Sequence, residues 1–125
     1  MTLDRWKTFE LFDYGIHLTT DNSYIGNVGV HTISWEHERC EIGYWILGKH
    51  EGQGFMSESV RVLEKACFDI GFHRIEIRCS SLNMRSANIP EKLGYKLEGT
   101  LTEDAIENGK FRNTLIFGKI STKRR

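Results

Sequence analysis

The most constraining feature of the chain is segment 41–71, where an apolar run, a glycine-containing turn and an amphipathic stretch follow one another. The run 41–47 predicts a strand. From Met56 the apolar residues fall at 56, 60, 63, 67 and 70, a spacing that predicts a helix ended by Gly71. The glycines at 52 and 54 let backbone N–H groups approach a bulky ligand. Because a helix N-terminus adds unpaired N–H groups and a positive dipole end, the segment predicts a phosphate or pyrophosphate site.

Three other interpretations share part of this geometry. The run GYWILGK (43–49) has the glycine and lysine spacing of a nucleotide P-loop, but His50 stands where a Ser or Thr would ligate magnesium. The run GQG (52–54) begins a dinucleotide fingerprint, yet Ser57 occupies the third glycine position. In the third interpretation the turn binds nothing and only starts a helix, with Ser57 as a candidate cap.

Composition and charge set broad limits on the chain. Its 125 residues, 39% of them hydrophobic, predict one domain over 1–120 with a frayed basic tail at 121–125. Lys and Arg number 17, as do Asp and Glu, so net charge favours neither nucleic acid nor anionic lipid as a partner. The opening MTLDRWKTFELFDYG has no long apolar run, and we therefore expect a cytoplasmic protein.

Cysteine and histidine spacing predicts neither disulfides nor a metal site. Cys40, Cys67 and Cys79 are odd in number and form no CxxC, so all three are expected to be reduced thiols. Packing is favoured over reactivity for Cys67 and Cys79. The five histidines form no HExxH motif.

The remaining pattern predicts a mixed α/β chain. Strands are expected at 14–20, 25–35, 41–47, 74–80, 95–104 and 111–120, and helices at 56–70 and 84–93. Pro90 lies inside the second predicted helix, so that helix should start late or bend. Asn108 and Gly109 predict the turn of the last hairpin.

Four motifs in this order resemble a known family. The strand EIGYWI (41–46) precedes the loop EGQGFMSE (51–58), and NMRSANIPEKLGYKLEGTL (83–101) and NGKFRNTLIFGKI (108–120) follow. Together they resemble the GNAT superfamily of acetyltransferases, and within it the RimJ/RimL-type N-acetyltransferases, over about residues 24–120. The resemblance implies a GNAT-like α/β fold with a mixed, mostly antiparallel sheet, flanking helices and a parallel pair, 41–47 with 74–80, that splays apart. It also implies an acetyl-CoA site with the pyrophosphate on the backbone of 53–57.

The resemblance assigns a set of cofactor-binding residues. These are Ile46, Leu47, Glu51, Gly52, Gln53, Gly54, Phe55, Met56, Ser57, Asn83 and Ser86. The pantetheine arm would pair with the backbone of Ile46 and Leu47 as an added strand, and Asn83 would bind the same arm. A nearby N–H of that strand would polarise the thioester carbonyl. Glu51 departs from the Gln or Arg that the superfamily more often has there.

The implied chemistry is direct attack of an amine on the thioester. Many GNAT enzymes protonate the departing thiolate with a tyrosine seven residues after the asparagine, but that position is Pro90 here. Ser86, three residues after Asn83, is the candidate proton donor, with helix capping as its alternative role. The usual late glutamate falls on Ala105. Glu41 matches a glutamate common in this group, so the resemblance makes it the candidate catalytic base. Ion pairing or hydrogen bonding within the sheet is its alternative role.

A weak base favours one class of acceptor. An α-amino group has a pKa of about 7.7–8.0, against about 10.4 for lysine, so much more of it is neutral at pH 7. A protein or peptide N-terminal α-amine is therefore the preferred acceptor. A polyamine or small amine is one alternative, and a non-catalytic CoA-binding remnant is another.

The start of the chain also departs from the family. Related proteins usually carry one further strand and two helices before the hairpin around residues 21–23, whereas this chain begins almost at that hairpin. We expect an N-terminally truncated GNAT-like fold. Three explanations are open: the start is a truncation, the acceptor site is open, or a second subunit completes it. An uncovered sheet edge would favour a homodimer.

Overall fold

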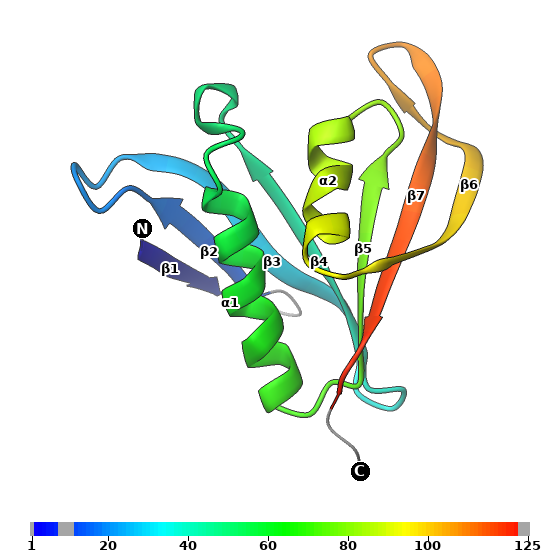
Figure 1. Cartoon of the computed structure of the whole chain (residues 1–125), viewed down its shortest axis with the longest axis horizontal. Coiled ribbons are helices and arrows are strands. Elements are labelled where there is room, and N and C mark those ends of the chain that lie inside the picture. The colour runs from blue at the N-terminus through cyan, green and yellow to red at the C-terminus, as the bar shows by residue number, and fades with distance from the viewer. Residues whose placement is uncertain (1, 8–11, 123–125) are drawn as a thin grey trace.

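A computed structural model describes residues 2–7 and 12–122 of the chain. They form one seven-stranded sheet in the order β1-β2-β3-β4-β5-β7-β6, and both helices lie on the same side of it (Figure 1). The strands are β1 (Thr2–Lys7), β2 (Phe12–His17), β3 (Tyr24–Ser34), β4 (Arg39–Ile46), β5 (Arg74–Ser80), β6 (Lys96–Glu107) and β7 (Lys110–Ile120). The helices are α1 (Phe55–Asp69) and α2 (Met84–Lys92), and a short 3-10 turn, η1, spans Gly48–His50.

The strand pairing confirms the predicted sheet. Every neighbouring pair is antiparallel except β4 and β5, which run parallel. This parallel pair holds only from Arg39 opposite Arg74 to Glu41 opposite Glu76. Beyond Glu41 the two strands continue without pairing, so each presents an unpaired edge to the gap between them.

One strand was absent from the sequence prediction. β1 pairs with β2 along its whole length, from Thr2 opposite His17 to Lys7 opposite Phe12. The run TLDRWK has no sustained apolar pattern, and an edge strand is held by backbone hydrogen bonds to its neighbour, which composition does not reveal. β1 therefore precedes the β2–β3 hairpin and covers the β2 edge.

The core lies between the sheet and the helices. The predicted stripe of α1 is confirmed at four positions, because Met56, Val60, Leu63 and Cys67 are all buried. They pack in one cluster with the inward side chains of the sheet, which include Ile25, Val28, Ile42, Ile75, Ile77 and Phe117. Burying one such side chain contributes about 1.5–3 kcal/mol to stability.

The end of α1 differs from the prediction by one residue. Ile70, assigned to the apolar stripe, is the C-cap and is 65% exposed. Gly71 follows in the left-handed region with φ 116°. Its N–H donates to Phe68 O at 3.2 Å and the next N–H, of Phe72, donates to Cys67 O at 3.1 Å. This Schellman motif ends the helix at Asp69, so Ile70 does not continue the buried stripe.

Three further features bear on function. Cys40, Cys67 and Cys79 are buried free thiols, as predicted. Among residues 2–7 and 12–122, no three His, Cys, Asp or Glu side chains come together in a way that could hold a metal ion. Neither described helix combines the length and the apolar character that crossing a membrane requires.

Candidate functional site

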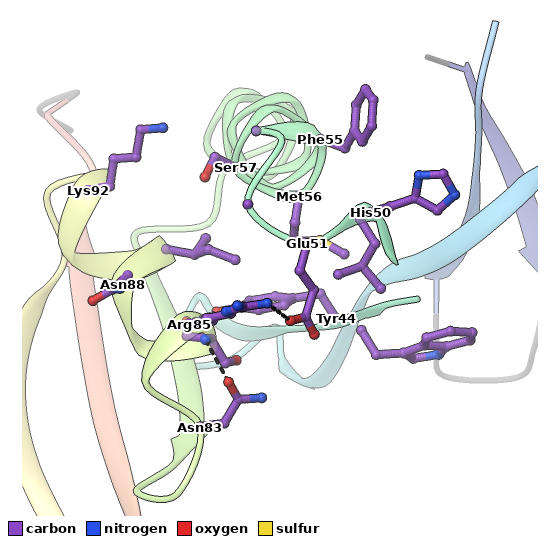
Figure 2. Close-up of a pocket in the computed structure, with 16 residues that line it drawn as sticks. Tyr44, His50, Glu51, Phe55, Met56, Ser57, Asn83, Arg85, Asn88 and Lys92 are labelled. Carbon is purple, nitrogen blue, oxygen red and sulfur yellow. Dashed lines mark hydrogen bonds and ion pairs between the residues drawn. The ribbon is translucent and has the colours of Figure 1, made fainter. Parts of the chain in front are cut away.

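A cavity of about 430 Å³ opens where β4 separates from β5, between the start of α1 and the start of α2 (Figure 2). Its wall comes from β4, from the loop that leads into α1, and from α2. The lining residues are Tyr44, Trp45, Ile46, His50, Glu51, Gly52, Gly54, Phe55, Met56, Ser57, Asn83, Arg85, Ser86, Asn88, Ile89 and Lys92. The structure therefore brings together segments of the chain that are more than 30 residues apart in sequence.

Most of the predicted cofactor-binding residues line this cavity. They are Ile46, Glu51, Gly52, Gly54, Phe55, Met56, Ser57, Asn83 and Ser86. Gln53 and Leu47 do not. The Gln53 side chain is exposed and donates from Nε2 to Lys49 O at 3.3 Å, within the loop.

The loop glycines have the backbone conformation that only glycine adopts easily. Gly52 and Gly54 lie in the left-handed region, with φ 76° and 81°. A Cβ added at either position would meet no protein atom within 4 Å. The backbone angle and the open space beside the loop, not packing, therefore make glycine suitable at these two positions.

The start of α1 presents unpaired donors to the cavity. Gly54 is the N-cap, and no side-chain hydrogen bond caps the start of α1. Ser57 therefore does not take the capping role for which it was a candidate. The first helical bond runs from Glu58 N to Gly54 O at 3.0 Å. The N–H groups of Phe55, Met56 and Ser57 consequently have no partner within the helix. With the dipole of the 15-residue helix behind them, these groups favour an anion.

The register of β4 corrects one assigned residue. Leu47 donates its N–H to Ile25 O of β3 at 2.8 Å, and its carbonyl accepts from His50 N at 2.9 Å. It therefore does not fit the role of pairing with an added strand. Since hydrogen-bonded positions alternate along an antiparallel pair, the residues whose backbone groups point into the gap are Tyr44 and Ile46.

Asn83 and Ser86 meet at the start of α2, but their roles differ from the predicted alternatives. Asn83 is the N-cap, and its Oδ1 accepts from Ser86 N at 3.0 Å. The cap is thus Asn83 and not Ser86. The Ser86 hydroxyl instead lies 3.8 Å from Cys79 Sγ on β5. Ser86 is partly buried in the cavity wall.

Pro90 lies in the interior of α2 and creates a contact that sequence reasoning missed. A residue with an N–H at this position would donate to the carbonyl four residues earlier, which belongs to Ser86. Because proline has no N–H, this carbonyl is available, and it accepts from Tyr44 Oη at 2.7 Å. Tyr44 Oη also lies 3.7 Å from Cys79 Sγ. The hydroxyl thus ties β4 to the first turn of α2 across the gap.

Burial determines the protonation of this cluster. It raises the pKa of the Tyr44 hydroxyl well above its usual range, and the neighbouring Cys79 adds to the effect. Burial likewise raises the pKa of the Cys79 thiol. Both groups therefore stay protonated at neutral pH, and Tyr44 acts there as a fixed hydrogen-bond donor.

Glu41 does not line the cavity. It alternates along β4 with Cys40 and Ile42, whose side chains are in the core, so its own side chain points to the opposite face of the sheet. There Glu41 lies 4.0 Å from His31 Nε2 and 4.0 Å from Arg78 Nε. This geometry favours ion pairing, the alternative left open for Glu41, and its role as a base stays a prediction. The position aligned with the family glutamate, Ala105, is on β6 outside the cavity lining.

The basic residues of the cavity were not predicted as site residues. Arg85, Lys92 and His50 line the cavity, and Glu51 is the one acidic side chain among the lining residues. Arg85 and Lys92 follow Asn83 by two and nine residues on α2. Their spacing from Asn83 was the available signal, but only the packing of α2 beside the α1 loop shows that they face an anion site.

Comparisons with known proteins find similar sequences over most of the chain. The family model described as acetyltransferase (GNAT) domain matches residues 2–96. Ribosomal-protein-serine acetyltransferase of Escherichia coli (strain K12) is 27% identical over 80% of this chain and 56% of its own length. Spermidine N(1)-acetyltransferase of Vibrio cholerae is 25% identical over 83% of this chain and 66% of its own length.

A solved structure shares the fold. RimL, a ribosomal L7/L12 α-N-protein acetyltransferase in complex with coenzyme A, superposes with a TM-score of 0.82 at 25% identity. The superposition covers 89% of this chain and 62% of RimL. The chain spans about 60% of the length of the curated relatives that it matches.

Proposed function

Because the chain belongs to the acetyltransferase (GNAT) domain family, we propose that it transfers an acetyl group from acetyl-CoA to a primary amine. The observation that carries the proposal is the cavity at the β4–β5 gap, which places an anion-binding helix start beside an unpaired strand edge. These are the two features that a phosphate-bearing, amide-containing co-substrate requires.

The co-substrate's diphosphate fits the start of α1. The left-handed backbone at Gly52 and Gly54 curves the loop around open space, and the unpaired N–H groups of Phe55, Met56 and Ser57 follow at once. In this proposal those groups hold the diphosphate. Positive side chains on α2 line the facing wall of the cavity.

The pantetheine arm fits the edge of β4. Its amides would hydrogen-bond the backbone of Tyr44 and Ile46, the β4 residues whose polar groups point into the gap. This arrangement directs the thioester down the gap toward the point where β4 joins β5. An N–H of β4 would then polarise the thioester carbonyl, a contribution of about 3 kcal/mol in comparable sites.

The reaction is direct acyl transfer. The amine nitrogen forms a bond to the acetyl carbon, the carbon–sulfur bond breaks, and one amine proton is lost to a base or to water. The departing thiolate takes up a proton or accepts a hydrogen bond, and Ser86 is the proposed donor because its hydroxyl lies in the cavity wall. Tyr44 positions Ser86 by holding its carbonyl.

We further propose an N-terminal α-amine as the acceptor. The one carboxylate that lines the cavity, Glu51, lies in the loop before α1, at the proposed diphosphate end and not at the thioester end. Among the lining residues, no carboxylate therefore lies beside the proposed thioester position, which favours an amine that is partly neutral at pH 7. RimL and the ribosomal-protein-serine acetyltransferase are named for protein acceptors, whereas the spermidine acetyltransferase is named for a polyamine.

The first prediction is therefore acetylation of a peptide α-amine. The purified chain is incubated with acetyl-CoA and, separately, with a peptide that has a free N-terminus, the same peptide blocked at its N-terminus but carrying a lysine, or spermidine. Thiol release is followed, and products are identified by mass spectrometry. The free peptide should react faster than the blocked one, because more of its amine is neutral.

Three other outcomes have distinct meanings. Faster release with spermidine would overturn the α-amine acceptor and favour the polyamine alternative. CoA binding without thiol release above hydrolysis would indicate the non-catalytic CoA-binding alternative. Failure to bind CoA would overturn the proposed function.

A further inference from the structure

An ion pair crosses the cavity at the proposed diphosphate site. Glu51 lies in the loop that precedes α1, and Arg85 lies in the first turn of α2. Arg85 Nη1 donates to Glu51 Oε2 at 2.7 Å, so the two side chains join opposite walls (Figure 2). Both residues line the cavity.

The carboxylate is unexpected at this position. The start of α1 favours an anionic ligand, and Glu51 is a like charge beside that ligand. A diphosphate could approach more easily if this carboxylate were neutral or absent, so Glu51 should lower the affinity for CoA.

Arg85 is free to change partners. Its side chain is 72% exposed, against 30% for Glu51, so the guanidinium remains largely hydrated in the ion pair. Ion pairs of this exposure are weak and are screened by salt. A guanidinium can also bind phosphate oxygens in a bidentate manner, and a diphosphate carries more charge than one carboxylate.

We propose that Arg85 is a CoA-binding residue and that Glu51 competes with CoA for it. The Glu51–Arg85 pair spans the cavity between the α1 loop and α2. When CoA binds, Arg85 exchanges Glu51 for the diphosphate. This inference rests on the proposed function, because it takes the cavity to be the CoA site.

The exchange predicts opposite effects for the two partners. E51Q removes the competing charge and should tighten CoA binding by about two- to tenfold. R85Q removes a phosphate ligand and should weaken binding by a similar factor. Because Arg85 contacts the ligand itself, R85Q should also weaken binding in an E51Q background. Neither change should alter binding of pantetheine, which has no diphosphate.

The test measures the dissociation constants of CoA and of pantetheine for the parent chain and each variant by calorimetry. The measurements are repeated at higher salt. Lys65 and Asp69 on α1 supply matched controls, because they form another exposed pair at 2.7 Å and neither residue lines the cavity. D69N and K65Q make the same net-charge changes as E51Q and R85Q and should leave CoA affinity unchanged. Circular dichroism and thermal unfolding check that each variant is folded.

The possible results separate this inference from the proposed function. Unchanged or weaker CoA binding by E51Q, with normal binding by the parent chain, would overturn the competition alone. An R85Q effect that disappears in the E51Q background would show that Arg85 only neutralises Glu51, which overturns the exchange. Absence of CoA binding by the parent chain would overturn the proposed function and this inference with it.

Discussion

At the residue scale, Gly54 makes the clearest contribution to the proposed site. Its φ of 81° and its place as the N-cap of α1 direct the following N–H groups into the cavity. An added Cβ would meet no protein atom, so any steric effect beyond backbone strain must come from a ligand. This separation of strain from ligand contact makes Gly54 suitable for a direct test.

We expect Gly54→Ala to reduce the thermal stabilisation that CoA produces. The left-handed backbone should cost about 1–2 kcal/mol in stability, and the Cβ should also obstruct the phosphate. Gly109→Ala is the matched control, because Gly109 has φ 77° and open space around it but lies in the β6–β7 turn. Both variants should lose similar stability without ligand, and only Gly54→Ala should lose the CoA response. Equal responses would contradict the assignment of the loop.

At the scale of the elements, the contact between β4 and α2 depends on two residues that look unrelated in sequence. Pro90 removes a helical N–H and leaves the Ser86 carbonyl available, and Tyr44 supplies the missing donor from β4. The proline therefore neither delays the helix, which begins at Met84, nor prevents it from continuing to Lys92. Its effect is to let a strand bind the helix through a buried hydroxyl.

Tyr44→Phe should lower turnover more than it changes CoA affinity. Loss of the hydroxyl leaves the Ser86 carbonyl without its strongest donor, which should cost about 1 kcal/mol in unfolding free energy and loosen the first turn of α2. The measurements are denaturant unfolding, kcat and KM for acetyl-CoA, with Ser86→Ala for comparison. If Ser86 acts on the leaving thiolate, the double variant should be little worse than Ser86→Ala alone.

Tyr14→Phe is the control for this change. Tyr14 packs against the core from β2, and its hydroxyl forms no hydrogen bond among the described residues. The Tyr14→Phe substitution should therefore leave kcat near the parent value. Turnover by Tyr44→Phe equal to that of the Tyr14→Phe control would contradict the positioning role.

At the scale of the whole molecule, a row of charges runs across the sheet face opposite α1 and α2. Arg74 bonds Glu98 of β6 at 2.6 Å and Glu76 at 3.1 Å, and Arg78 bonds Glu76 at 2.7 Å. Arg78 also approaches Glu41 of β4. The row thus connects β4, β5 and β6, and Glu76 is its central carboxylate.

Acid should weaken the fold through Glu76. Partial burial alone would raise its pKa, but hydrogen bonds from Arg78 and Arg74 outweigh burial and lower it below the ordinary value of 4.5. The stabilisation is therefore present above about pH 4.5 and is lost as pH falls through the lowered pKa. Glu76→Gln should cost about 0.5–1 kcal/mol near neutral pH and less in acid. Unfolding free energies measured from pH 7 downward should converge for the two proteins, and parallel curves would contradict the assignment.

Assembly and location stay predictions. β6 is an edge strand, and its hairpin with β7 exposes Leu97, Leu101, Ile106 and Phe111, which keeps a homodimer among the expected states. Cytoplasmic location and the single domain over 1–120 likewise stay predictions.

The sequence by itself determined the parts of the protein that depend on local chemistry. Residues 41–71 predicted strand, loop and helix, because apolar spacing and glycine conformation act over a few residues. The order of motifs predicted the family, which the family-model match confirms. Only tertiary structure decided which backbone groups of β4 face the gap, that Tyr44 compensates for Pro90, and that Arg85 reaches Glu51. These contacts join residues about 20 to 46 positions apart, so they depend on strand register and helix packing, which no local pattern specifies.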